Sequence, residues 1–203
     1  MTMPASPNAL NMAGTSSPVS VAYELGLGLT TTISMDQAAV RTLAGVGGSG
    51  TTWSMSSLHG KSNRTVAFND ANTFSSSVLG NGCTSTLTFL ADGTITATFT
   101  GSGGWAAAPT SFISPTGSTT GMSIRCNWTS ISRGGSAVVS VFGTTVGAVA
   151  SYDSGYVSFG GVNKVITGSS PNISSFFTAT GVIYITDGTT TISRAFDFFD
   201  FQI

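Results

Sequence analysis

The stretch from Thr84 to Thr100 constrains the fold of this chain most, because polar and apolar residues alternate along it on both sides of a turn. Thr84–Leu90 and Thr94–Thr100 alternate between hydroxyl-bearing and apolar residues, and Ala91-Asp92-Gly93 between them is typical of a hairpin turn. Successive side chains of a strand point to opposite faces of the sheet. The pattern therefore predicts two paired strands, each with one buried and one solvent-exposed face.

The sequence beyond residue 120 continues in the same way, with short β segments separated by glycine-containing turns. Its many Thr, Val and Phe residues suit a pleated, half-buried surface. About eight short strands without helical periodicity predict a mainly β chain whose residues 65–203 form an antiparallel β-sandwich. The further strands expected are Met122–Ile131, Ala137–Val146, Tyr156–Phe159, Lys164–Thr167, Phe176–Thr186 and Thr191–Ile203.

The last expected strand carries aromatic residues in both phases. Phe196 and Phe198 share one phase, whereas Phe199, Phe201 and Ile203 share the other. A regular strand would place these two sets on opposite faces. Either a bulge lies near Phe198 and Phe199, or both faces are covered, one of them by another subunit.

Residues 1–20 are rich in Pro, Ser, Asn and Ala and show no periodicity. Pro4, Pro7 and Pro18 interrupt both helical and ladder hydrogen bonding, so we expect an extended arm. An arm of this kind often becomes ordered only against a partner, and a frayed terminus is the alternative.

Residues 21–64 have the features of a small two-helix module. Ser34 and Gln37 have the spacing of a capping box, and Gly45 stands where a left-handed C-terminal cap is expected. Apolar residues recur at helical spacing between them, which predicts an amphipathic helix over residues 35–44. A shorter helical turn is expected over residues 54–58.

Two helices this short cannot bury a core alone, so we expect the module to dock onto a neighbouring chain or domain. In a module so poor in charge, each charged group is expected to be hydrogen bonded, and Arg41 with Glu24 is the best candidate pair. The expected interface residues are Glu24, Met35, Val40, Arg41, Leu43, Trp53, Met55, Leu58 and Lys61.

The low content of charged residues indicates which kinds of partner the chain can bind. Charged residues make up 7% of the chain, far below the roughly 25% typical of soluble proteins. A net charge of -1 gives little long-range repulsion, which favours self-association or burial in an assembly. The seven Lys and Arg residues form no basic stripe, which argues against nucleic acid. No secretory signal or run of about 20 apolar residues occurs, so we expect synthesis in a cytoplasm and no membrane insertion.

Few residues could carry catalysis or hold a cofactor. His59 is the only imidazole, and no Gly-x-Ser-x-Gly elbow marks a nucleophile. The glycine runs 47–50 and 101–104 lack the Lys-Ser/Thr pair of a phosphate-binding loop, so we expect turns there. We therefore expect no enzyme activity, no catalytic residue and no cofactor.

Cys83 and Cys126 lie in or beside expected strands. We expect buried thiols, because a cytoplasmic origin disfavours a disulfide, and a bridge formed after release into an oxidising medium is the alternative. Zinc would need about four ligands and a single His accompanies the two Cys, so we expect no metal site.

Several aromatic residues of the β region could face a partner. Four of them could stack on sugar rings, or could be core and interface aromatics of a sandwich. The candidate partner-facing residues are Trp105, Trp128, Tyr152, Tyr156, Phe199 and Phe201.

Residues 24–62 contain a series of short motifs. The motifs are Glu24-Leu25-Gly26, Ile33-Ser34-Met35, Val40-Arg41, Leu43-Ala44-Gly45, Ser54-Met55-Ser56, Leu58 and Gly60-Lys61-Ser62. In this order they resemble a module of structural proteins of tailed bacteriophages. Trp53 and Ser57 depart from the usual Ile and Asp of that pattern, which weakens the cap of the second helix.

The resemblance implies a non-enzymatic virion structural protein, docked through its N-terminal module onto other phage virion proteins. Such proteins belong to the tail, baseplate or fibre, so we expect a virion location, with the tail favoured, after synthesis in the host cytoplasm. We expect a homo-oligomer and favour a trimer. The alternatives are a receptor-binding or glycan-binding module that meets a host surface glycan, and a capsid decoration protein.

Overall fold

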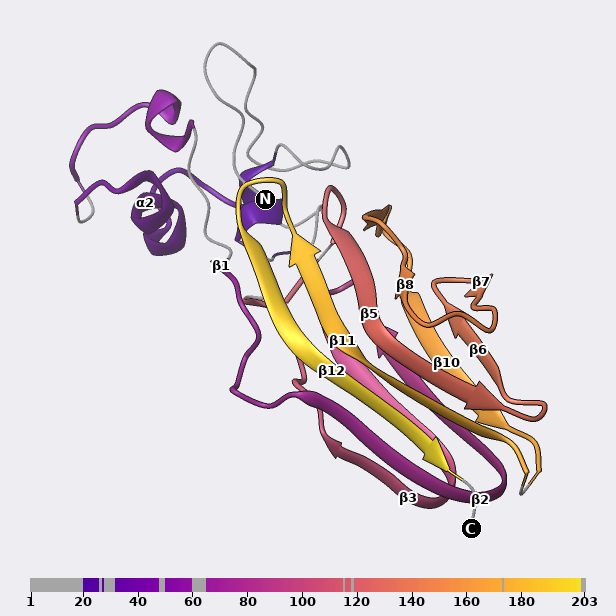
Figure 1. Ribbon diagram of the computed structural model, residues 1–203. Coiled ribbons are helices and arrows are strands. Elements are labelled where there is room, and N and C mark those ends of the chain that lie inside the picture. Colours follow the sequence, from indigo (N-terminus) through magenta and orange to yellow (C-terminus); the bar gives the residue numbers. More distant parts are fainter. Residues whose placement is uncertain are drawn as a thin grey trace.

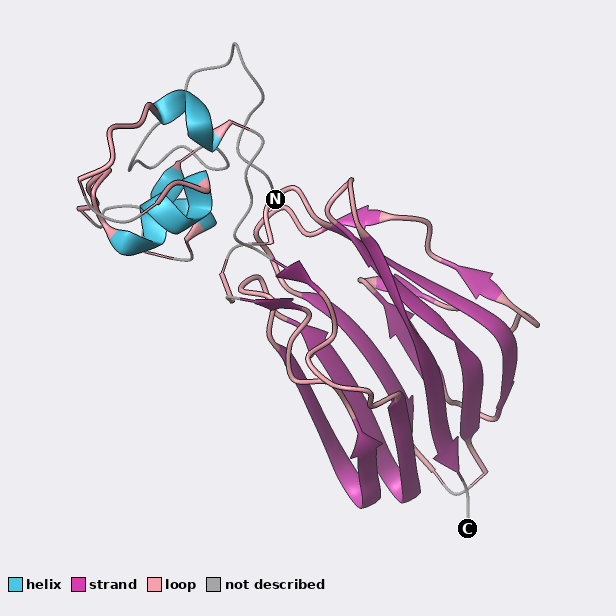
Figure 2. Cartoon of the chain, turned by 90° about the vertical axis from the view of Figure 1, so that its left-hand side faces the viewer, coloured by secondary structure: helices cyan, strands magenta, loops and turns pink. Residues whose placement is uncertain are grey.

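The chain is mainly β, with short helices before residue 60 and strands after residue 64 (Figure 1). A computed structural model describes residues 20–25, 27, 32–47, 50–59, 65–114, 116–117, 119–172 and 174–201. Figure 2 shows the helices grouped beside one end of the sheet, apart from the strands. None of the helices in these residues is long and apolar enough to cross a membrane.

Among the described residues before residue 60, one helix is longer than a single α-turn. This is α2 (Ala38–Ala44), preceded by the four-residue α1 (Val21–Glu24), which the sequence did not predict. The second expected helix is a single turn of 3-10 helix, η1 (Met55–Leu58). The Oγ of Ser54 caps it by accepting a hydrogen bond from the Ser56 amide at 3.3 Å.

Helix α2 begins three residues later than expected. A turn in which the Gln37 amide donates to the Ser34 carbonyl (3.2 Å) precedes it, and Gln37 makes no side-chain capping bond. The predicted capping box is therefore wrong. The C-terminus is as predicted, because Gly45 is left-handed (φ 71°) and closes the helix. The amides of Gly45 and Val46 donate to Thr42 and Arg41, the two bonds of a Schellman motif.

The strands divide into a small sheet and a large one. The strands are β1 (Thr65–Val66), β2 (Phe74–Phe89), β3 (Ile95–Ala107), β4 (Ile113–Ser114), β5 (Ser123–Gly134), β6 (Val138–Val141), β7 (Thr144–Thr145), β8 (Tyr152–Asp153), β9 (Val157–Ser158), β10 (Lys164–Ser170), β11 (Phe176–Thr186) and β12 (Thr191–Phe201). β1 pairs with β4, and the other ten form one sheet in the order β7-β6-β10-β2-β12-β11-β5-β8, with β3 beside β2 and β9 beside β5.

The expected hairpin across residues 91–93 and the expected strand over residues 176–186 are confirmed. The expectation of an eight-stranded, purely antiparallel sandwich is wrong, because β12 runs parallel to β2, with Phe196 opposite Phe74. These two strands are joined by most of the domain rather than by a hairpin, so no turn dictates their relative direction.

The sheet curls because β2 and β3 bend together. The first part of β2 pairs with β12 and its last part pairs with β10, while β3 follows β2 on the other side throughout. The register of the β2–β3 pair shifts between Leu79 and Thr84, beside Gly82 (φ 73°) and Gly101 (φ 109°). Residues 101–104 are thus part of β3 and not the turn that the sequence predicted. Glycine suits such a bend, because it adopts the required positive φ.

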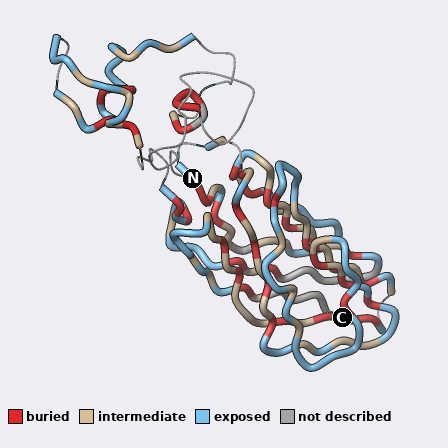
Figure 3. Tube along the Cα trace, turned by 90° about the horizontal axis from the view of Figure 1, so that it is seen from above, coloured by how far each residue is buried: buried red, intermediate tan, exposed pale blue. Residues whose placement is uncertain are grey.

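The core lies inside the curled sheet. Buried and partly exposed residues alternate along its strands, as the tube of Figure 3 shows. Trp128 of β5 is fully buried, with its ring centroid 5.6 Å from that of Phe196 and 5.5 Å from that of Phe177. Aromatic contacts of this kind hold the two halves of the sheet together.

Strand β12 has no bulge near Phe198 and Phe199. Its register is continuous from Phe196 to Phe201 against β2, and from Thr191 to Asp200 against β11. The bulge that the two aromatic phases suggested is therefore wrong. The side chains of residues 198–201 lie outside the described part of the structure, so the second explanation, a face covered by another subunit, stays a prediction.

Candidate functional site

The helical region has its own small core, separate from that of the sheet. Its buried members come from all three helices, and the two cores share no residue. The buried members are Val21, Val40, Leu43, Ala44 and Leu58, and partly buried Leu25, Ile33, Val46 and Trp53 surround them. The short helices therefore bury one another, which makes this region a unit distinct from the sheet.

Arg41 organises the loops of this unit from inside it. Its side chain is only 5% exposed. Nε and Nη2 donate to the Gly47 carbonyl at 2.8 and 2.7 Å, and Nη2 also donates to the Thr51 carbonyl at 3.2 Å. Nη1 donates to Oδ1 of Asp36 at 3.1 Å. A buried guanidinium needs such partners, and here they tie the loop after α2 to the turn before it.

The expected interface residues divide into two groups by burial. Val40, Arg41, Leu43 and Leu58 lie inside the unit, as does the fully buried Glu24, because the short helices use these side chains to cover one another. Met35, Trp53 and Met55 are half-buried. Lys61 lies outside the described residues, and the pairing of Arg41 with Glu24 stays a prediction.

The candidate partner-facing aromatics with described side chains differ in burial. Trp128 is in the core, so its place among them is wrong, because it shares the inward phase of β5 with Ile124 and Cys126. Trp105 is partly buried and donates from Nε1 to the Thr98 carbonyl at 3.0 Å. Tyr152 packs partly buried beside Trp128. The side chains of Phe199 and Phe201 are not among those described.

Tyr156, which is 49% exposed, belongs to a cluster that the sequence did not predict. Arg125, on the outward phase of β5, lies 5.9 Å from the Tyr156 ring and 5.4 Å from the ring of Tyr184, its register partner on β11. Its guanidinium pairs with both carboxylate oxygens of Asp153, through Nε at 2.8 Å and through Nη2. The sequence could have indicated that Arg125 points outward, because it alternates with the apolar residues of β5. Which residues lie beside it depends on the strand register, which the sequence does not reveal.

The Arg125–Asp153 pair has shifted protonation equilibria. The hydrogen bond from Arg125 lowers the pKa of the Asp153 carboxyl, and the Gly155 amide, which donates to Oδ1 at 2.9 Å, lowers it further. The same bond raises the pKa of Arg125. These shifts favour the charged form of both groups, and the ion pair fixes β8 against β5.

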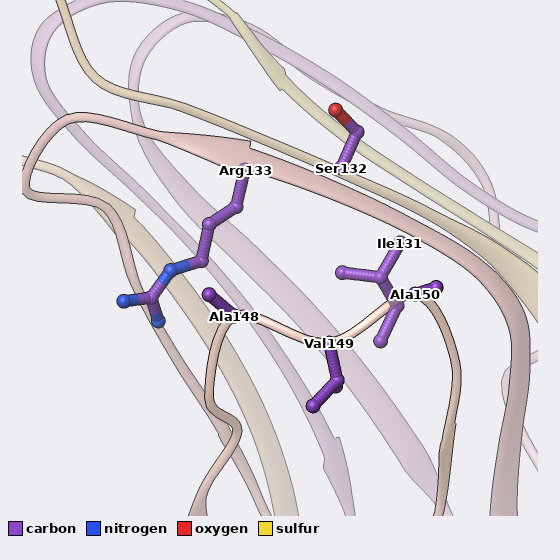
Figure 4. Close-up of a pocket in the computed structure, with 6 residues that line it drawn as sticks. All are labelled: Ile131, Ser132, Arg133, Ala148, Val149 and Ala150. Atoms are coloured by element: carbon purple, nitrogen blue, oxygen red, sulfur yellow. The ribbon is translucent and has the colours of Figure 1, made fainter.

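A shallow groove of about 280 Å³ lies between the end of β5 and the segment 148–150 (Figure 4). Ile131 and Val149 supply its larger apolar side chains, and Arg133 donates to the Val146 carbonyl at 3.0 Å beside it. The six residues that line the groove include no carboxylate, imidazole or thiol.

Both cysteine side chains are buried, as expected. Burial raises the pKa of the Cys126 thiol, which disfavours the reactive thiolate. Among the residues that the structure describes, no three His, Cys, Asp or Glu side chains cluster closely enough to hold a metal ion.

No family model, curated protein or solved structure matches the chain.

Proposed function

We propose that the chain is a non-enzymatic structural protein of a tailed-phage particle, present in many copies and docked by its helical region. The observation that supports this most is the second core of residues 20–58, which the sheet does not need for its own packing. A separately packed unit that carries the motif series of phage virion proteins is suited to attachment, while the sheet packs laterally or projects.

The docking surface would be formed by the half-buried residues of this unit. Met35, Trp53 and Met55 keep apolar surface in contact with water, and Met is an adaptable side chain at interfaces. Arg41 ties the turn that carries Met35 to the loop that precedes Trp53 and Met55, so it positions the surface without facing the partner. The partner would be another virion protein, at the tail or tail tip in our preferred placement.

Cryo-electron microscopy of purified particles tests the proposal. We expect many copies of the chain at the tail, with Met35 and Met55 buried against a neighbour. Met55→Lys should reduce incorporation, whereas Val138→Lys, at a residue that is 51% exposed on β6, should incorporate normally. Absence of the chain from particles would overturn the proposal, and a copy number matching that of the major capsid protein would favour a capsid decoration protein.

The exposed Tyr156 favours a second candidate, a module that binds a glycan of the host surface. An aromatic ring beside a paired Arg and Asp offers stacking and hydrogen bonds to a sugar. Glycan-array binding that is lost in Tyr156→Ala would support this function. Trp128 does not contribute, because it is fully buried, and the indole N–H of Trp105 is already bonded to the Thr98 carbonyl.

A further inference from the structure

Strand β3 forms an unusually open edge of the large sheet. It is 13 residues long and pairs with β2 alone among the described strands. Figure 1 shows it at the margin of the sheet, with no strand beyond it. The strands at the other margins, β7, β8 and β9, are two residues each. Short edges resist pairing with other chains, whereas a long edge invites it.

The hydrogen-bonding groups on the outer side of β3 can be assigned. The Thr94 carbonyl accepts from Leu90 within the hairpin, whereas the Ile95 amide donates outward to the Thr110 carbonyl at 2.8 Å. Because the direction alternates along a strand, the backbone groups of Ala97 and Phe99 also point outward. No described residue hydrogen-bonds to them there.

The same part of β3 has little support from its surroundings. Every residue from Thr98 to Gly103 is exposed, although a strand with one covered face would bury every second residue. Phe99 is 44% exposed and its ring lies over Gly104, where a Cβ would come within 2.5 Å of Cε1. Among the described strands, β3 has a neighbour on one side only, so a second strand on its open side would add hydrogen bonds at this point.

The composition of this edge indicates what would cover it. Ile95–Ala107 contains no charged residue and no proline, the two usual protections of an edge strand. A charged partner strand would have no opposite charge to pair with on this edge. A second copy of β3 carries no charged residue, so it suits the edge. The net charge of -1 on each chain produces little repulsion between two copies.

We propose that two copies of this chain associate by antiparallel pairing of their β3 strands about a two-fold axis. An identical strand is complementary to itself in this arrangement, because each outward amide of one copy faces an outward carbonyl of the other. The Thr residues on either side of Ala97 and Phe99 would then lie across from one another, as favourable hydroxyl pairs. The pairing gives a dimer and not the trimer favoured from the sequence, and it does not depend on the particle proposed above.

Sedimentation equilibrium of the purified chain over a range of concentrations tests this pairing. We expect a monomer–dimer equilibrium that Phe99→Lys and Ala97→Pro each weaken about tenfold or more, since the first opposes like charges and the second removes an outward donor. Ala97→Pro spares the bonds to β2. Val162→Lys, at a loop residue that is 56% exposed, is the matched control and should dimerise normally.

Hydrogen exchange provides a second readout that a nonspecific dimer would not change. The amides of Ala97 and Phe99 should exchange more slowly as the concentration rises, and that of Val162 should not. A wild-type chain that stays monomeric, or an oligomer of any size that both β3 variants leave unchanged, overturns the proposal. Circular dichroism establishes that each variant is folded, and Phe99→Lys alone decides the outcome if Ala97→Pro does not fold.

Discussion

Gly181 of β11 lies so close to Asn127 of β5 that a Cβ placed on it would be 2.0 Å from the Asn127 carbonyl oxygen. The close approach coincides with the shift of register between Thr180 and Gly181. A glycine is therefore required at this point, where two central strands of the sheet meet at a bulge.

Gly181→Ala should lower the free energy of unfolding by about 1–3 kcal/mol, because the contact is with rigid backbone and the strands must separate to admit a methyl group. Denaturant unfolding followed by circular dichroism measures the change. Gly147→Ala is the control, since no atom lies within 4 Å of a Cβ at that glycine. Equal stabilities of the two variants would contradict the inferred constraint.

The period-two pattern of residues 84–100 predicted its hairpin correctly, because both the alternation and the turn are local. The parallel pairing of β12 with β2 could not be predicted, since segments far apart in the chain meet only when the sheet curls. Residues 101–104 were misinterpreted for a different reason. Glycine serves both turns and bent strands, and only the β2 partner distinguishes the two.

At the candidate sites too, local patterns were predictable from the sequence and contacts between distant segments were not. Hydrophobic spacing predicted that Val40, Leu43 and Leu58 pack together, but not that their burial would be complete within the unit. The Arg125 cluster escaped prediction because it requires the register that places Tyr184 opposite Arg125, and the pairing of β8 with β5 that brings Asp153 to the same face. Pairings of this kind are tertiary, and no local pattern encodes them.

Trp128→Ala should destabilise the sheet by about 3–5 kcal/mol, the usual cost of removing a large buried aromatic side chain. Tyr156→Ala should change the free energy of unfolding by less than about 0.5 kcal/mol, because Tyr156 is half exposed. Chemical denaturation of both variants measures this. The reverse order would mean that Trp128 faces outward and does not belong to the core.

Arg41→Ala should destabilise the helical region by about 2–3 kcal/mol while leaving the sheet intact, because the carbonyls of Gly47 and Thr51 lose a buried donor. Hydrogen exchange should quicken in α2 and η1 and stay unchanged in β5 and β11. Asp36→Asn is the control. Asp36 is 72% exposed and its loss leaves the carbonyl bonds in place, so its effect should stay below about 1 kcal/mol.

Asp153 should contribute to stability only above mildly acidic pH. Its pKa is lowered in the folded chain by the bond from Arg125, so the unfolded chain binds more protons as the pH falls. The contribution is present above the usual Asp pKa of about 3.9 and is lost as the pH falls through the lower folded value. The stability difference between wild type and Asp153→Asn, measured by denaturation at several pH values, should therefore shrink below about pH 4.

Cys126 should resist alkylation in the folded chain. Burial raises the pKa of its thiol, so almost no thiolate is present near neutral pH, and the surrounding core excludes the reagent. Cys83 is also fully buried.

Iodoacetamide labelling followed by mass spectrometry should therefore find both thiols unmodified in the native chain and both modified in denaturant. A Ser151→Cys variant, at an exposed residue, is the positive control and should react without denaturant. Rapid native labelling of Cys126 would show that β5 opens from the sheet more readily than its packing implies.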